Sequence, residues 1–180
     1  MTSRILLRNL FRGPLTERAP AADPGALAEL AARVDAASRA RLGRSLAIRE
    51  VDAGSCNGCE LEIHALQNIV YDLERFGLRF VASPRHADVL LVTGPVTRNM
   101  REALERTYAA TPDPKWVVAV GDCARDGGLF APSAACVGGV SRVVPVDLHI
   151  AGCPPTPQAL LAGLLALLED VCRQKRDSAS

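Results

Sequence analysis

The chain has 180 residues, of which 48% are hydrophobic and only 4% aromatic, so it suits one domain with a core of small aliphatic side chains. Its 21 Lys and Arg residues balance 20 Asp and Glu residues, which argues against a nucleic-acid surface that works by neutralising phosphates. No apolar run reaches the roughly 18 to 20 residues that span a bilayer, and the N-terminus lacks a secretory signal. We therefore expect a cytoplasmic chain, in which thiols stay reduced.

Residues 1–44 are expected to form an N-terminal extension that is helical in parts and contains a linker. The segment RILLRNLF predicts a short amphipathic helix that Gly13 and Pro14 end. Because this segment is both basic and apolar, its composition favours docking onto a partner or a membrane surface over packing on its own domain. Asp23 and Pro24 then predict the N-cap and first turn of a helix over residues 26–42, which Gly43 ends.

Residues 45–172 are expected to form a single α/β domain, because strand and helix patterns alternate along them. Strands are predicted at 45–51, 78–83, 87–94, 115–121 and within 142–152, and helices at 60–76, 99–108 and 156–172. This alternation predicts a doubly wound, mostly parallel, flavodoxin-like sheet with helices on both faces. In such a sheet, the loops after the carboxyl ends of the strands form the binding crevice. Residues 173–180 are expected to be a flexible tail.

Four of the six cysteines follow predicted strands. Cys56 and Cys59 follow the first strand, Cys123 follows the strand at 115–121, and Cys153 follows the last strand. These loops lie at one edge of the sheet, where four thiolates could bind zinc or an iron–sulfur cluster. The segments AGSCNGC, VGDCARDGG and AGCPP are rich in small residues, which let backbone amides approach inorganic sulfur, and this favours a cluster.

Other interpretations of the cysteines explain less of the pattern. A redox dithiol at Cys56 and Cys59 leaves the two later cysteines unexplained, and a structural zinc site more often uses two close Cys pairs or His. Four inert thiols would have no reason to fall only in such loops. Cys136, within a loop, and Cys172, near the end of the last helix, are interpreted as ordinary small apolar residues.

The segments GSCNGCELEI, LLVTGPVT, AVGDCARDGG and VPVDLHIAGCPPTP, in this order, resemble a known family. They are similar to the small subunit of membrane-bound, energy-converting (group 4) [NiFe]-hydrogenases of the formate hydrogenlyase and hydrogenase-4 type. The same superfamily contains the 20 kDa subunit of respiratory complex I. The resemblance covers about residues 45–170. It implies one [4Fe–4S] cluster with Cys56, Cys59, Cys123 and Cys153 as ligands.

Two details of the resemblance favour the hydrogenase branch. Two residues separate Cys56 from Cys59, which is similar to the hydrogenase pattern, whereas the complex I subunit has two adjacent cysteines there. The chain also resembles the short, single-cluster type that faces the cytoplasm, since it shows neither the signal nor the cysteine-rich domain of exported uptake hydrogenases. The implied function is an oxidoreductase subunit that relays electrons and carries no complete active site.

The resemblance also implies partners. They are a [NiFe]-hydrogenase-type large subunit, a ferredoxin-like iron–sulfur subunit, and membrane-arm subunits that attach the chain peripherally to the inner face of the cell membrane. A complex I-like subunit that passes electrons to quinone is the alternative function, and a zinc-stabilised structural protein is the remote one.

Residues around the cysteines have weaker assignments. Glu62, one helical turn after Cys59, is a candidate for proton relay or for the interface with the large subunit; a helix-dipole role explains it as well. Glu60 is interpreted as a first-turn helix residue only. His64 is a candidate interface residue.

Overall fold

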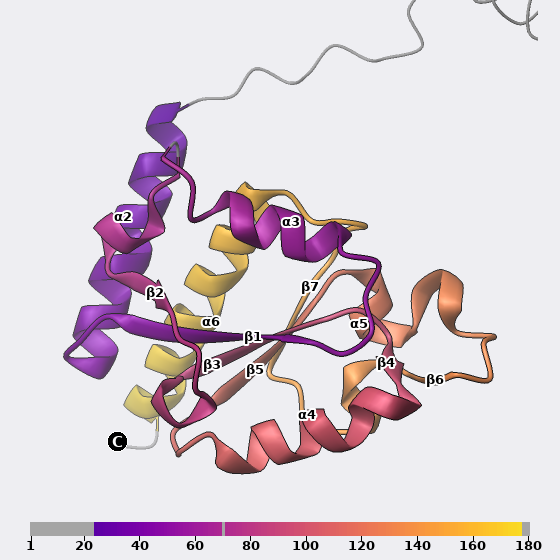
Figure 1. Ribbon diagram of the computed structural model, residues 1–180. Coiled ribbons are helices and arrows are strands. Elements are labelled where there is room, and N and C mark those ends of the chain that lie inside the picture. Colours follow the sequence, from indigo (N-terminus) through magenta and orange to yellow (C-terminus); the bar gives the residue numbers. More distant parts are fainter. Residues whose placement is uncertain (1–23, 70, 178–180) are drawn as a thin grey trace, which may run out of the picture.

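The computed structural model describes residues 24–69 and 71–177 and contains a five-stranded sheet between two layers of helices (Figure 1). The spatial order of the strands is β2 (Leu78–Phe80), β1 (Leu46–Asp52), β3 (Val89–Thr93), β5 (Trp116–Val120) and β7 (Leu148–Ile150). Every neighbouring pair is parallel. The predicted doubly wound α/β fold is therefore confirmed, with the strand order of flavodoxin-like sheets.

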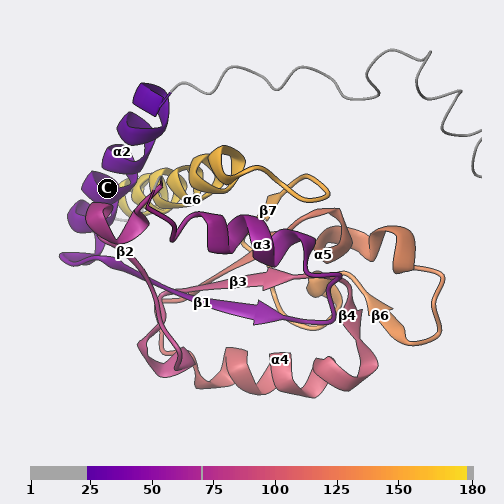
Figure 2. The ribbon, with the colours of Figure 1, turned by 45° about the horizontal axis from the view of Figure 1, so that its top comes forward.

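Helices cover both faces of the sheet (Figure 2). One face carries α2 (Pro24–Leu42), α3 (Gly58–Ala65) and α6 (Pro157–Asp177), and the other carries α4 (Arg98–Ala110). Strands β3 and β5 are buried at every position, as expected for central parallel strands with helices on both sides. The core accordingly divides into two aliphatic clusters, one on each face. None of the described helices is long and apolar enough to cross a membrane.

The helix predicted over residues 26–42 is confirmed and begins slightly earlier, at Pro24. It packs along α6, and Ala31 and Val34 are buried in the same aliphatic cluster as the α6 leucines. Gly43 ends it with a φ of 67°, and its N–H donates to the Arg39 carbonyl at 2.9 Å. The segment RILLRNLF, predicted to be an amphipathic helix, lies outside the described residues.

The helix predicted over residues 60–76 is wrong in length. Helix α3 ends at Ala65, and only a short 3₁₀ helix, η1 (Leu73–Phe76), follows before β2. The side chain of Asn68 accepts a hydrogen bond from the Tyr71 N–H at 3.1 Å, and such local bonds offer the backbone an alternative to a helix. Two large apolar side chains of this segment are exposed: Leu61 on α3 is 61% exposed, and Ile69, beyond the end of α3, is 97% exposed.

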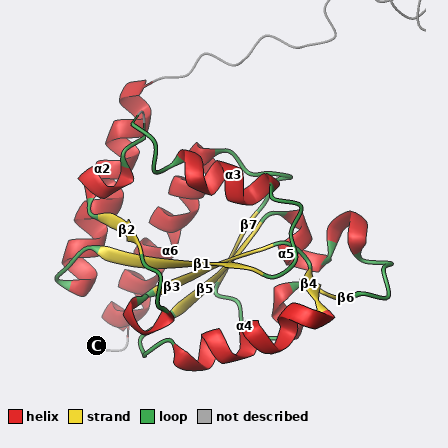
Figure 3. Ribbon diagram, viewed as in Figure 1, coloured by secondary structure: helices red, strands yellow, loops and turns green. Residues whose placement is uncertain are grey.

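Several short elements were missed by the sequence patterns, among them two strands and one α-helix (Figure 3). Strands β4 (Val96–Thr97) and β6 (Cys136–Gly138) form a separate two-stranded antiparallel sheet. Helix α5 (Asp122–Asp126) carries Cys123, which was expected in a loop. Elements this short contain too few residues to show a periodicity, which explains why they were not predicted.

A buried carboxylate joins the amino-terminal ends of β1 and β3. Asp88 is 4% exposed and accepts from both terminal nitrogens of Arg44, at 3.0 and 2.6 Å, and from the Ala47 N–H at 2.9 Å. Its own backbone N–H donates to the Ala47 carbonyl at 2.8 Å. Asp88 therefore helps to fix how β1 and β3 are aligned with each other.

We expect Asp88→Ala to lower the free energy of unfolding by about 2 kcal/mol, because a buried amide loses its acceptor and an ion pair is lost. Urea unfolding measures this. Glu102→Ala removes an exposed carboxylate that pairs with Arg106 on the surface of α4, and should cost less than about 0.5 kcal/mol. Equal effects of the two substitutions would contradict the role given to Asp88.

Candidate metal centre

The segments that follow β1, β5 and β7 meet at the carboxyl edge of the sheet and enclose a cavity of about 80 Å³. All four predicted cysteines line it. The lining consists of Ser55, Cys56, Gly58, Cys59, Gly94, Asp122, Cys123, Gly152, Cys153 and Pro154. The connection after β1 passes to one face of the sheet and that after β3 to the other, and such a switch point is where ligands bind in open α/β sheets. The predicted convergence of these loops is therefore observed.

The loop after β1 is shaped by its own side chains. Asp52 Oδ1 accepts from the N–H groups of Gly54 and Ser55, at 2.7 and 2.8 Å, and this is an Asx-type turn. Ser55 Oγ then accepts from the Asn57 N–H at 3.1 Å. Asn57 adopts a left-handed φ of 70° immediately before α3. These turns leave Cys56 exposed at the mouth of the cavity and bury Cys59 in the first turn of the helix.

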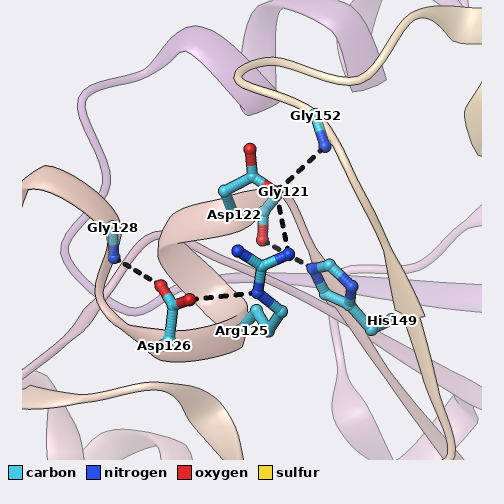
Figure 4. A network of polar contacts seen from close by, with 7 residues as sticks. All are labelled: Gly121, Asp122, Arg125, Asp126, Gly128, His149 and Gly152. Atoms are coloured by element: carbon cyan, nitrogen blue, oxygen red, sulfur yellow. Dashed lines mark hydrogen bonds and ion pairs between the residues drawn. The ribbon is translucent and has the colours of Figure 1, made fainter.

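The loops after β5 and β7 are bonded to each other (Figure 4). The Asp122 N–H donates to the Gly152 carbonyl at 2.9 Å, and the Gly152 N–H donates to Asp122 Oδ1 at 3.3 Å. His149 Nε2 lies 3.1 Å from the Gly121 carbonyl. Because Cys123 and Cys153 each follow one of these bonded residues, the contacts hold the backbones that carry the two thiols side by side.

Charged side chains of helix α5 contact one another and a residue just after its end (Figure 4). Arg125 pairs with Asp122 at 3.6 Å and with Asp126 at 3.0 Å. Asp126 also accepts from the Gly128 N–H at 2.8 Å, and these two hydrogen bonds hold the pKa of its carboxyl below the ordinary 3.8. The charges flanking Cys123 are thus largely paired with one another.

Three glycines bring bare backbone against the sulfur atoms. A Cβ at Gly121 would lie 2.8 Å from Cys59 Sγ, and a Cβ at Gly128 would lie 2.9 Å from Cys123 Sγ. Gly58 leaves 3.6 Å between such an atom and Cys56 Sγ. Gly58, Gly94 and Gly152 line the cavity itself. Walls of bare backbone suit a group that carries its own sulfur atoms, since amide N–H groups close to those atoms stabilise it.

The raised pKa values of two of the cysteine thiols favour binding of a positively charged group in the cavity. Burial raises the pKa of Cys59 to about 12, with further increases from Glu60 and from the other three cysteines of the cavity. Burial and the thiols of Cys153 and Cys56 also raise the pKa of Cys123. Four thiolates cannot form here together unless a positive group offsets their repulsion, which iron or another metal does when it displaces the thiol protons.

The geometry distinguishes a cluster from a single ion. Within residues 24–69 and 71–177, no three His, Cys, Asp or Glu side chains come close enough together to hold one metal ion. A structural zinc site needs four ligands within about 2.3 Å of the metal. The four cysteines instead surround a cavity, so the donor set fits a multi-atom iron–sulfur group better than zinc.

The other predicted residues lie outside this cavity. Glu62 is half-buried and His64 is exposed, both on α3, and neither lines the cavity. Cys136 is half-buried in β6 and lines a different cavity. Cys172 belongs to α6, but its side chain lies outside the described part of the structure.

Two glutamates near the cavity were not recognised as buried groups. Glu60 stands in the first turn of α3 as predicted, but it is only 6% exposed. Neither of its carboxylate oxygens has a hydrogen-bond partner among the described residues, nor does Glu50 Oε1 on β1. The sequence offered one signal for Glu50. Side chains alternate between the two faces of a strand, so Glu50 lies on the same face of β1 as the buried Leu46 and Ile48.

Comparison with known proteins places the chain in the class of oxidoreductase subunits. The model of the family "NADH ubiquinone oxidoreductase, 20 Kd subunit" matches residues 56–167. The chain therefore belongs to this family, whose members are subunits of hydrogenase and NADH-quinone oxidoreductase complexes. The predicted family relationship is confirmed.

Individual relatives come from both branches of the family. The chain is 47% identical to the probable membrane-bound hydrogenase subunit mbhJ of Pyrococcus furiosus over 73% of this chain and 79% of the relative. It is 46% identical to formate hydrogenlyase subunit 7 of Escherichia coli, over 81% of this chain and 58% of that protein. It is 50% identical to an NADH-quinone oxidoreductase subunit of Herpetosiphon aurantiacus over 65% of each chain.

A solved structure agrees with these relatives. The chain aligns with a TM-score of 0.63 and 36% identity to a chain of the membrane-bound sulfane sulfur reductase (MBS), an archaeal respiratory membrane complex. The alignment covers 77% of this chain and 74% of the other. At this identity the match supports a relationship as well as a shared fold.

We expect Gly121→Ala to reduce the iron content of the purified chain, because the added Cβ would meet Cys59 Sγ in the cavity. Gly43→Ala is the matched control: Gly43 also has a positive φ, but nothing lies within 4 Å of the added atom. The control should cost about 1 to 2 kcal/mol of stability, because Ala tolerates a left-handed φ less well than Gly, and should leave the iron content unchanged. An equal loss of iron in both variants would show that the contact between the added Cβ and Cys59 Sγ is not its cause.

The pKa of Glu50 gives a prediction about pH. Burial raises this pKa above the ordinary 4.5; His64 opposes the rise, and Glu60 and Asp52 add to it. Since the folded state then binds the proton more tightly, Glu50 stabilises the fold below pH 4.5, and this contribution is lost as the pH rises through the raised pKa.

Glu50→Gln should therefore raise the urea midpoint of the iron-free chain at neutral pH, and the gain should disappear below pH 4.5. Glu29→Gln, at an exposed site on α2, should leave the midpoint unchanged at both pH values. A gain that is equally large in acid would show that ionisation of Glu50 is not its cause.

Proposed function

We propose that the chain is the electron-transfer subunit of a membrane-associated hydrogenase complex, with one [4Fe–4S] cluster held by Cys56, Cys59, Cys123 and Cys153. The observation that carries this proposal is the cavity at the sheet edge, which these four thiols line together and where, among the described residues, no three metal-binding side chains are placed to hold a single ion. When bound, such a cluster supplies a site that gains and loses one electron at a time.

The chain's own residues would hold and insulate this site. The segments after β1, β5 and β7 present the four thiols, and Gly121 and Gly128 let backbone approach them. The Asp122–Gly152 bonds keep the two later segments together. Cys56 and Cys153 are exposed, so the cavity lies close to the surface on that side. A redox partner could therefore approach closely there without any rearrangement of the sheet.

The partners proposed are a [NiFe]-type large subunit on one side and a ferredoxin-like iron–sulfur subunit on the other, with membrane-arm subunits holding the complex at the inner face of the cell membrane. Support comes from the relatives with hydrogenase names and from the two-residue spacing between Cys56 and Cys59. Glu62 and His64, on the accessible part of α3, are proposed for the interface or for proton transfer across it.

A complex I-like subunit that passes electrons to quinone is the second candidate. The 50% identity to the NADH-quinone oxidoreductase relative of Herpetosiphon aurantiacus favours it. Nickel analysis of the complex that copurifies with the chain separates the candidates. Nickel in the large subunit supports the hydrogenase, and quinone reduction by a nickel-free complex supports the second candidate.

Electron paramagnetic resonance of the reduced chain, with iron, sulfide and zinc analysis, tests the cofactor. We expect one signal of a reduced [4Fe–4S] cluster and about four irons per chain. Zinc without iron, or a chain that gives no signal after anaerobic reconstitution, would refute the cluster.

Single substitutions test the ligand set. Cys56→Ser, Cys59→Ser, Cys123→Ser and Cys153→Ser should each abolish or change the signal, because each removes one thiolate from the cavity. Cys136→Ser is the matched control and should keep the signal, since Cys136 lies in β6, outside this cavity. A signal lost with Cys136→Ser but kept with Cys123→Ser would show that the assignment is wrong.

A further inference from the structure

A second cavity, of about 620 Å³, shares no lining residue with the cavity of the four predicted ligands. It is lined by Arg98, Arg101, Cys136, Val137 and Arg142. Its lining residues come from the start of α4, from β6 and from the 3₁₀ helix η4 (Val140–Arg142). Figure 3 shows the start of α4 next to the small sheet of β4 and β6. Three guanidinium groups thus border one concave surface, and no carboxylate is among the lining residues.

The positive charge of this arginine cavity is only partly offset. Arg101 pairs with Glu105 at 2.9 Å. Arg142 donates to the Val137 carbonyl at 3.0 Å, which orients its side chain without neutralising it. Arg98 has no ion pair among the residues that the structure describes. Two of the three cations therefore lack a counter-charge within the described chain.

Helix α4 adds to the positive potential. Arg98 and Arg101 stand in its first turn, where the helix dipole is positive, and that turn contains no acidic residue. The N-cap residue, Thr97, makes no capping hydrogen bond through its side chain. An anion at this place would meet favourable charge from the side chains and from the helix end at once.

The shape and the composition select among anionic ligands. Recognition of an anionic lipid surface typically uses four to eight basic residues with apolar side chains that insert beside them. The exposed large apolar residues of the described chain are Leu61, Ile69, Leu129 and Phe130, and none lines this cavity. A hollow lined by guanidinium forks suits carboxylates of an inserted segment, which Arg binds in a bidentate manner.

We propose that the arginine cavity is a docking site for an acidic segment of a neighbouring subunit, in which two Asp or Glu side chains pair with Arg98 and Arg142. That the neighbour is a subunit of the same complex rests on the proposed function. The site lies apart from the cysteine cavity, so it attaches the partner without covering the proposed cluster.

The first test uses the purified full chain and a fluorescein-labelled Gly-Glu-Gly-Glu-Gly peptide, measured by fluorescence anisotropy at low salt. Binding should weaken about tenfold in the R98Q/R142Q variant, because two charge-assisted contacts are lost. R79Q/R85Q removes the same charge at exposed sites elsewhere and should bind like the unchanged chain. R98Q alone, which breaks no contact within the described fold, should also weaken binding, and this separates docking from misfolding.

Competing ligands complete this test. A Gly-Gln-Gly-Gln-Gly peptide should not bind. Inorganic phosphate should compete only weakly, and vesicles of phosphatidylcholine with phosphatidylglycerol should not sediment the chain through these arginines. Equal binding of the glutamate peptide by the two double variants would overturn the proposal. So would vesicle binding that R98Q/R142Q abolishes while the peptide does not bind at all.

The second test uses the assembled membrane complex. R98E/R142E should release one partner subunit during purification, whereas R79E/R85E should retain all subunits, and the same subunits in both preparations would overturn the proposal. Electron paramagnetic resonance on each preparation keeps the two proposals separate. A chain that binds the acidic peptide but has no iron–sulfur signal refutes the cluster alone, and a chain with the signal but no peptide binding refutes the docking site alone.

Discussion

The crowding of four cysteine thiols in one small cavity is the constraint on which the rest of this structure depends. Burial and mutual repulsion raise the pKa of Cys59 to about 12, so the thiols resist ionising together unless a cationic group joins them. Holding them in place nonetheless requires a rigid frame. Parallel strands supply it, because they end at the same edge, and three of those ends carry the cysteine loops. Glycines then admit backbone where a side chain would collide with sulfur.

Much of this frame was predictable, because it depends on sequence patterns that extend over many residues. The buried strands β3 and β5 are continuous apolar runs, and the alternation with helices fixed the parallel topology. The convergence of the four predicted ligands followed from that topology, since they lie in the segments that follow β1, β5 and β7. That these four cysteines bind a cluster remains a prediction. The family relationship was also predictable, because its motifs surround these same loops.

The features that were missed depend on local or three-dimensional effects. The early end of α3 reflects the Asn68 side chain bonding to the Tyr71 backbone, which competes with a helical pattern that otherwise continues. The arginine cavity unites α4 with β6 and η4, segments about forty residues apart, and no sequence motif joins them. Glu60 is only 6% exposed, although a charged residue in a first helical turn ordinarily suggests exposure.

The two walls of the cysteine cavity differ in how they are held, and this bears on local opening. The loops of Cys123 and Cys153 are bonded to each other through Asp122 and Gly152, so neither can move without breaking contacts of both. The loop that presents Cys56 is tied to β3 and β4 only at Ala53, which bonds to Thr93 and Thr97. From Gly54 to Asn57, the hydrogen bonds of the described structure stay within the loop and the start of α3. Because segments open as cooperative units, the Cys56 side has the lower opening free energy. The cavity therefore has one side that opens more readily and one that is held more firmly. The amides on the Cys56 side should exchange hydrogen with solvent first.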